Sequence, residues 1–356
     1  MPISENKTTY EEVLKQIQSP DSTAMEICRR RWDSIAKPLH SLGKLEDGLI
    51  KIGGMVGSSK IELNKKALVI MCADNGVVEE GVTQTGSEVT AIVSENFLEL
   101  KSCACVMAKQ AGAEVFPVDI GINRDTRLPN HNKIAYGTKN IAKEPAMTIE
   151  QAIQAIEVGM KKVVELKEAG YKIIATGEMG IGNTTTSSAV ASVLLDLEVE
   201  EVTGKGAGLT KEGLLRKIEV IKQAIHTNTP DKNDPIDVLS KIGGLDIAGM
   251  VGLYLGGAAA RIPVIMDGFI SSVAALLAIR IESKVRHYIL PSHLSKENAG
   301  MLILEALDMR PFLNCDMCLG EGTGAVALYP LLDMALAIYN EMSTFEEIEI
   351  EAYQPL

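Results

Sequence analysis

Basic and aromatic side chains are both scarce in this sequence of 356 residues. Lys and Arg number 35 against 47 Asp and Glu, so the formal net charge is −12. A surface of this charge repels nucleic-acid phosphates, and we expect no nucleic-acid partner. An anionic small molecule would need backbone N–H groups and a few cations gathered at one place. Aromatics make up only 4% of the chain, while small and aliphatic residues are abundant, a balance typical of helices packed on a buried parallel sheet.

Cysteines and long apolar runs are also scarce. Six cysteines do not make a disulfide scaffold in a chain of this length. Cys315 and Cys318 form a lone CxxC; a zinc site needs about four ligands, which His131 or His293 could help to supply, but free thiols and no metal are the favoured interpretation. No apolar run approaches the roughly 20 residues of a membrane span, and residues 1–10 are polar. We therefore expect no membrane partner and a cytoplasmic location.

Short apolar runs that end abruptly in polar or glycine residues recur along the chain. Helical stripes with apolar residues at spacings of three and four separate them. This alternation predicts an α/β fold, an open and mostly parallel sheet with flanking helices (Rossmann-like). The carboxyl ends of parallel strands form the ligand crevice of such sheets, so the polar clusters should converge there. The predicted runs are 67–72, 114–118, 171–175, 262–266 and 287–290.

The two ends of the chain read as helices without intervening strands. Residues 8–60 carry helical patterns, and 328–342 carries another, followed by an acidic tail. We expect a small helical domain from residues 1–60 and 335–356 and a large α/β catalytic domain from residues 61–334. The length also favours this division, because single cores stop growing at roughly 250 to 300 residues.

Three glycine-rich loops are candidates for chemistry. Gly180–Thr184 follows a strand and opens a helix, where N–H groups attract anions and Asn183 or Thr184 could cap the helix; a plain turn is an equal alternative. Gly204–Gly208 lacks the dinucleotide spacing but precedes a helix with Arg216 and Lys217, either of which could meet an anion.

The third loop, Gly320–Gly324, places Glu321 among small residues, so that its carboxylate can face a ligand and act as a general base. The alternative is a turn whose Glu favours the next helix's N-terminus. The sequences Asp74–Gly76 and Asp267–Gly268, at strand ends, are interpreted slightly better as turns than as ligand sites. His293 also follows a strand, but a capping or packing role is the favoured interpretation.

Taken in order, these motifs resemble the nicotinate-nucleotide–dimethylbenzimidazole phosphoribosyltransferase family along nearly the whole chain. The motifs are SLGKLE (41–46), MCADNGV (71–77), GEMGIGNTTT (177–186), DVLSKIGGLDIAGM (237–250), PVIMDGF (263–269), ILPSH (289–293) and LGEGTGA (319–325). The resemblance implies transfer of phosphoribose from nicotinate mononucleotide to an aromatic lower-ligand base of cobamides, with inversion at C1′ and without a metal or organic cofactor.

The resemblance also implies roles for individual residues. Glu321 stands at the position of the catalytic glutamate, which removes the acceptor's proton. The phosphate and ribose would be held by Glu178, Gly180, Ile181, Gly182, Asn183, Thr184, Gly204, Lys205, Gly206 and Lys217. The acceptor pocket would be formed by Asp74, Thr85, Gly86, Val93 and Leu319.

Departures from the family pattern gather in that pocket. The family's Asp-His-Gly is Asp74-Asn75-Gly76 here, its Ser-Pro is Thr85-Gly86, a glutamine is Val93, and an arginine is Cys318. Because valine cannot hydrogen-bond a second ring nitrogen, we hypothesise an acceptor with fewer polar atoms. A branch that resembles this family uses phenol or p-cresol as a heterodimer with a paralogous subunit; a homodimer is the other assembly expected. The alternative function is a non-catalytic paralogue that stabilises an active partner, and a nucleotide-dependent dehydrogenase is disfavoured because no strand-linked GxGxxG exists.

Overall fold

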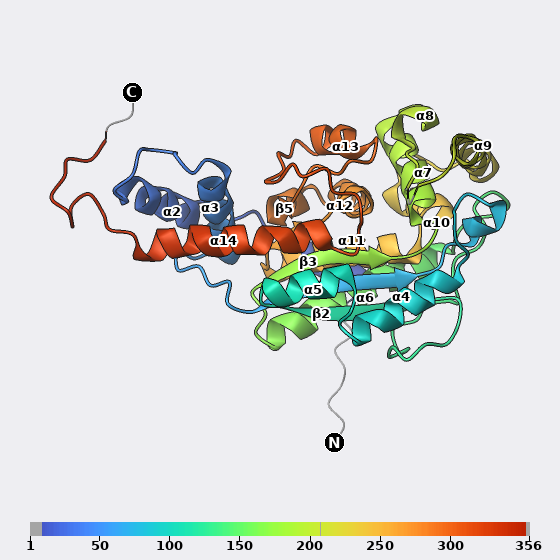
Figure 1. Ribbon diagram of the computed structural model, residues 1–356, viewed down its shortest axis with the longest axis horizontal. Coiled ribbons are helices and arrows are strands. Elements are labelled where there is room, and N and C mark those ends of the chain that lie inside the picture. Colours follow the sequence, from blue (N-terminus) through green and yellow to red (C-terminus); the bar gives the residue numbers. More distant parts are fainter. Residues whose placement is uncertain (1–8, 207, 354–356) are drawn as a thin grey trace, which may run out of the picture.

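The computed structural model describes residues 9–206 and 208–353, and its centre is a parallel sheet (Figure 1). The strand order is β2-β1-β3-β4-β5, and every neighbouring pair is parallel. The predicted α/β class is therefore confirmed. The strands are β1 (Lys66–Ala73), β2 (Ala113–Gly121), β3 (Ile173–Met179), β4 (Val264–Met266) and β5 (Ile289–Pro291).

Helices cover both faces of this sheet. α6 pairs closely with α11, which packs on β1, β2 and β3, while α4, α5 and α14 lie against the opposite face (Figure 1). The helices are α1 (Tyr10–Gln16), α2 (Ser22–Ser34), α3 (Lys44–Val56), η1 (Gly76–Glu80), α4 (Glu88–Leu98), α5 (Cys103–Gln110), α6 (Ile149–Glu168), α7 (Asn183–Leu195), α8 (Val199–Val202), α9 (Lys211–Asn228), α10 (Pro235–Ile242), α11 (Leu245–Ala260), α12 (Phe269–Ile281), η2 (Ser283–Tyr288), α13 (Gly300–Ala306) and α14 (Thr323–Glu341). No helix within the described residues is long and apolar enough to cross a membrane.

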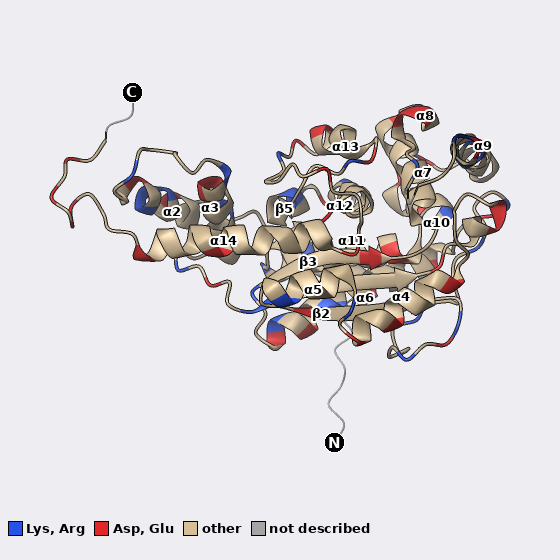
Figure 2. Ribbon diagram, viewed as in Figure 1, with Lys and Arg blue, Asp and Glu red and all other residues tan. Residues whose placement is uncertain are grey.

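β1, β3, β4 and β5 are buried along their whole length, as strands of a doubly covered sheet are, whereas the first half of the edge strand β2 is only partly covered. All eight residues of β1 are buried, and the strands carry few charged residues, whereas charge is frequent on the outer helices (Figure 2). β3 continues to Met179, past the predicted end at Ala175. Its polar end is kept in the sheet by pairing with β1, in which Glu178 lies opposite Met71.

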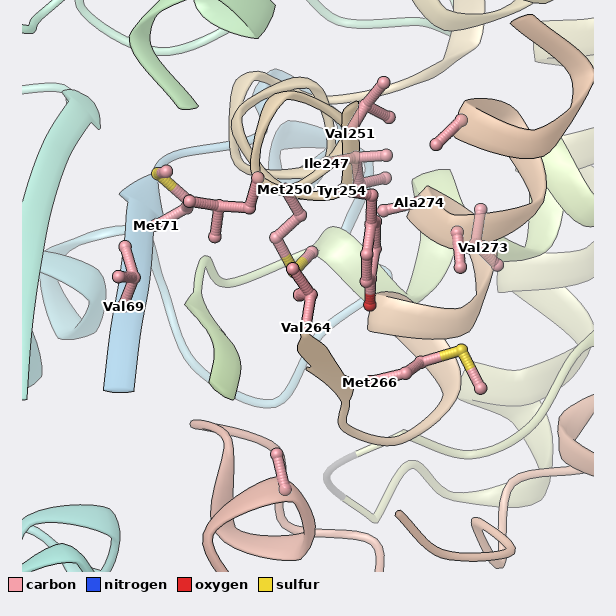
Figure 3. Packing of buried hydrophobic residues seen from close by; sticks show 14 of the residues in the cluster. Val69, Met71, Ile247, Met250, Val251, Tyr254, Val264, Met266, Val273 and Ala274 are labelled. Atoms are coloured by element: carbon pink, nitrogen blue, oxygen red, sulfur yellow. The ribbon is translucent and has the colours of Figure 1, made fainter. Parts of the chain in front are cut away.

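The core between β4, α11 and α12 also carries a polar network. Figure 3 shows Tyr254 among Met250, Val264 and Val273. Its buried hydroxyl lies 2.6 Å from the Ser271 hydroxyl, which also accepts the N–H of Asp267 (3.1 Å). The network fixes the carboxyl end of β4, where the site begins.

α14 joins the sheet to the terminal helices. It starts at the sheet's carboxyl edge, crosses β3 and ends beside α2 and α3 (Figure 1). There the rings of Trp32 and Tyr339 meet edge to face, 5.3 Å apart. The predicted boundary between residues 334 and 335 thus falls inside one continuous helix, and α1 packs on α6 and α11. The division into a small helical and a large α/β domain stays a prediction.

Candidate active site

A cavity of about 460 Å³ lies over the carboxyl ends of β3, β4 and β5. Its walls come from the segments that follow these strands and from the loop before α14. The order of the strands reverses between β1 and β3, and ligands of open α/β sheets bind beside such a reversal. The segments lining it are 82–85, 178–184, 205–206, 267–271, 318–321, and single residues that include Leu209, Lys217, His293, Ser295 and Glu297.

The loop between β3 and α7 brings backbone close to the cavity. A Cβ on Gly180 would lie 2.4 Å from the Ala73 carbonyl oxygen, and Gly182 has a φ of +94°. Gly182 is the N-cap of α7 and no side chain caps that end, so the expected cap by Asn183 or Thr184 is absent. An uncapped helix N-terminus beside glycines is an anion-binding arrangement.

Lys217 extends from α9 toward this helix end. It is 1% exposed, and its Nζ donates to the Thr184 hydroxyl (2.9 Å) and to the Gly204 carbonyl oxygen (3.2 Å). Burial lowers its pKa to about 8, an effect that the charge of Glu297 partly offsets. A buried ammonium bonded to neutral oxygens favours an anionic ligand.

Arg216, the other cation left open by the sequence, lies elsewhere. Its guanidinium is 58% exposed and donates to the Glu80 carbonyl oxygen. It is not among the residues that line the cavity. Of the two cations, Lys217 is the one in a position to meet a phosphate.

Glu178 belongs to a buried cluster of two carboxyl groups joined by an amide. The Asn183 side-chain nitrogen donates to Glu178 and to Asp246, the latter at 3.0 Å. Burial, reinforced by Asp246, raises the pKa of Glu178 to about 8, and burial raises the pKa of Asp246 to about 6. The pair therefore retains a proton at neutral pH.

Glu321 occupies a strained loop. Its φ is +59°, between Gly320 at +86° and Gly322 at +84°, a left-handed run that is unusual for a residue with a side chain. Asp267 holds this loop to the end of β4, because its carboxylate accepts the N–H groups of Gly322 (3.2 Å) and Ala325 (2.9 Å). The catalytic candidate is thus fixed by a charged cap on α14.

The Glu321 carboxyl group is partly shielded from water. Its Oε2 is buried and has no hydrogen-bond partner within the described part of the chain. Burial raises its pKa, while the Ala104 N–H and the Ser102 hydroxyl oppose the rise. Glu321 is one of the residues that line the cavity, and a carboxyl group with a raised pKa has the chemistry of a general base.

The predicted phosphate and ribose residues gather around this cavity. Glu178, Gly180–Thr184, Lys205, Gly206 and Lys217 line it, and Gly204 contributes the carbonyl oxygen that accepts from Lys217.

The predicted acceptor residues are divided. Thr85 and Leu319 line the cavity with Glu321, whereas Gly86 and Val93 do not, Val93 packing partly buried on α4. Asp74 lies at a second cavity of about 580 Å³, beside the ends of β1 and β2.

Three residues of the site were undervalued or missed by sequence reasoning. Asp267 and His293 each follow a strand, a signal that the turn and capping interpretations discounted. His293 is buried in the cavity wall with its Nδ1 3.0 Å from the Ser292 hydroxyl. Asp246 is one partner of Glu178, and no local pattern predicts a contact between residues so far apart in sequence.

The cysteines do not form a metal centre in the described residues. All six are free, and Cys318 lines the cavity beside Leu319. No group of three or more His, Cys, Asp or Glu side chains in residues 9–206 and 208–353 is placed to hold a metal ion.

Comparison with known proteins shows the family of the chain. A family model described as a phosphoribosyltransferase matches residues 17–350. The chain is 49% identical over 346 residues to the nicotinate-nucleotide–dimethylbenzimidazole phosphoribosyltransferase of Acetivibrio thermocellus, which covers 97% of this chain and 99% of that protein. The chain belongs to the nicotinate-nucleotide–dimethylbenzimidazole phosphoribosyltransferase family. It is an enzyme of the pentosyltransferase type, as the sequence motifs predicted.

Further relatives of the family extend the match to a solved structure. The like-named protein of Ruminiclostridium cellulolyticum is 49% identical over 350 residues, covering 98% of this chain and 99% of its own. The crystal structure of CobT from Thermus thermophilus superimposes with a TM-score of 0.87 at 37% identity, covering 93% of this chain and 100% of that one. The chain therefore shares the fold of this family over nearly its whole length.

Proposed function

We propose that this enzyme transfers the 5-phosphoribosyl group of nicotinate mononucleotide to an aromatic acceptor, releasing nicotinate. The product would be an α-ribotide that supplies the lower ligand of a cobamide. The observation that carries the proposal is that one cavity is lined both by a buried cation beside a helix N-terminus and by Glu321, a carboxyl group whose pKa is raised by burial. The first suits a phosphate and the second a base.

The nucleotide would bind with its phosphate at Lys217, Thr184 and the N-terminus of α7, which no side chain caps. These groups supply the local positive potential that an acidic protein otherwise lacks. Glu178, the member of the Glu178–Asp246 pair that keeps its proton at neutral pH, can donate to a ribose hydroxyl, and the pair then carries one negative charge instead of two near the phosphate.

The chemical step needs one positioned base. Glu321 takes the proton from the acceptor's N–H or O–H, and the acceptor's electron pair forms a bond to C1′ of the ribose. The bond between C1′ and the pyridinium nitrogen breaks, and its electron pair leaves with nicotinate. Because nicotinate leaves a cationic glycosyl pyridinium readily, positioning and proton removal are the contributions required of the protein.

The acceptor is dimethylbenzimidazole or a phenol, since each presents one acidic hydrogen to Glu321. The argument for a phenol from Val93 is weakened, because Val93 does not line the cavity. Acceptor choice would instead depend on three residues that line the cavity. Two of them, Thr85 and Cys318, differ from the family pattern, and the third is Leu319.

A competition assay tests this proposal. The isolated chain is incubated with nicotinate mononucleotide and equal concentrations of dimethylbenzimidazole, phenol and p-cresol, and the ribotides are identified by mass spectrometry. We expect nicotinate release matched by one ribotide mass. Preference for dimethylbenzimidazole with phenol inert would reject the phenolic branch. Failure with every acceptor, reversed by adding a paralogous subunit but unaffected by Glu321→Gln, would instead favour the non-catalytic partner.

A further inference from the structure

A buried hydroxyl on α4 supports the site loop from behind. The N–H of Ile181, in the cavity wall, donates to the Thr90 hydroxyl at 3.0 Å. Thr90 is fully buried and does not line the cavity itself. It therefore acts on a ligand only through the loop that it holds.

The Ile181 N–H is the partner of this buried hydroxyl. The Asp74 carboxyl group is held separately, because the Asn123 N–H donates to its Oδ2 at 2.8 Å while its Oδ1 has no hydrogen-bond partner within the described residues. A hydroxyl oxygen can accept an N–H through either lone pair, so Thr90 can hold the Ile181 N–H without a second partner.

Close contacts with Asn75 also restrict the position of the loop between β3 and α7. A Cβ on Gly180 would meet the Asn75 side chain at 3.1 Å, and one on Gly182 would meet Asn75 Cβ at 3.3 Å. The loop thus rests on the segment after β1, and the bond to Thr90 fixes the peptide between its two glycines.

We infer that Thr90 is a positioning residue that holds the Ile181 peptide so that the start of α7 and Asn183 face the nucleotide. This inference rests on the proposed function for the identity of the ligand.

The test compares Thr90→Val, which keeps the shape but removes the hydroxyl, with Thr90→Ser, which restores it. An unsatisfied buried N–H costs roughly 1 to 3 kcal/mol, so Thr90→Val should raise the Kd and KM for nicotinate mononucleotide on the order of tenfold. We expect kcat to change much less and Thr90→Ser to recover most of the affinity. Ser94→Ala, another buried hydroxyl one turn along α4, is the matched control and should leave the Kd unchanged.

A ligand-free readout separates this inference from the proposed function. Hydrogen exchange of the peptide that contains residues 180–184 should be faster in Thr90→Val than in the wild type and in Ser94→Ala. Unchanged exchange, or equal loss of nucleotide affinity in Thr90→Val and Ser94→Ala, would overturn the positioning role. If the wild type failed to bind nicotinate mononucleotide, the proposed function would fall, and the exchange result would still decide the role of Thr90.

Discussion

Lys217 is a buried cation whose hydrogen-bond partners are neutral oxygens, and we expect its charge to bind the phosphate of the nucleotide. Replacing it with Met keeps the length but removes the charge. Hydrogen bonds to charged groups contribute about 1.5 to 3 kcal/mol, so Lys217→Met should raise the Kd for nicotinate mononucleotide by roughly 10- to 100-fold. The free energy of unfolding should change by less than about 1 kcal/mol, because relief of charge burial offsets the lost bonds to Thr184 and Gly204.

Calorimetric titration and urea unfolding measure the two quantities separately. Arg216→Met is the matched control, since Arg216 is adjacent in sequence but points to Glu80. An equal loss of affinity in both variants would mean that net charge, and not the position of Lys217, attracts the nucleotide.

Glu178 should make stability depend on pH. Its pKa in the folded protein is about 8, above the ordinary 4.5, so the folded state keeps a proton that the unfolded chain releases. The stability due to this group is fully present below about pH 4.5 and is lost as the pH rises toward 8. Glutamine has no such dependence, so the Tm of Glu178→Gln relative to wild type should increase from pH 5 to pH 8.

Thermal unfolding across that range checks the sign. Glu168→Gln, at the exposed end of α6, serves as the control and should track the wild type at every pH. If the Tm of Glu178→Gln minus the Tm of the wild type stayed constant or became lower toward pH 8, Glu178 would be ionised in the folded protein.

Single residues differ in how far the sequence could predict them. The place of Glu321 in the cavity wall was predictable, because a lone carboxylate among glycines has a local signature, while its role as a base stays a prediction. Asp246 was not, since its role depends on meeting Glu178 and Asn183 after folding. Asn183 was predicted as a cap, but its amide serves the two carboxyl groups and leaves the helix end open.

At the scale of elements, the loop before α14 determines where the base lies. Gly322 has a φ of +84°, and a Cβ there would lie 2.4 Å from Leu68 Cδ1 and 2.9 Å from the Thr176 carbonyl oxygen. Gly322→Ala should lower the free energy of unfolding by roughly 2 kcal/mol or more and reduce kcat, because Glu321 must shift with the loop.

Gly112→Ala isolates the backbone part of this effect. Gly112 also has a positive φ, +66°, but a Cβ there would meet no atom within 4 Å. It should cost about 1 kcal/mol in urea unfolding and leave kcat unchanged. Equal stability and equal kcat for the two variants would contradict a steric role for Gly322.

The elements themselves were predicted better than their ends. Apolar runs predicted every strand of the sheet, because burial on both faces leaves a strong local signal. The run ending at Ala175 stopped short of Met179, since Thr176 and Glu178 are polar. They stay in β3 because strand pairing satisfies their backbone and because Thr176 hydrogen-bonds to Ser271, 95 residues away, and Glu178 accepts from Asn183 at the start of the helix that follows the strand.

For the whole molecule, a continuous core favours cooperative unfolding. The buried apolar cluster runs from Trp32 and Leu49 in the terminal helices to Leu68 in β1. α14 bridges the two regions, and Asp333 on it pairs with Lys66 of β1 at 2.5 Å. We expect one transition, so that the fluorescence of Trp32, the single tryptophan, and the circular dichroism of all helices change at the same urea concentration.

An early fluorescence transition would instead support an independently folding helical domain. The sequence predicted this domain from terminal helices without strands. It could not reveal that α14 belongs to both regions, because the length of that helix is fixed by packing at its two ends.

The central claim is that Glu321 acts as the base for phosphoribosyl transfer in a cavity that binds nicotinate mononucleotide. The most direct test is the rate of ribotide formation by wild type and Glu321→Gln, measured by mass spectrometry beside the Kd of the nucleotide. We predict an unchanged Kd and a rate lower by on the order of 10² to 10⁴ for Glu321→Gln. Full turnover by Glu321→Gln, or no ribotide from the wild type with any acceptor, would contradict the account.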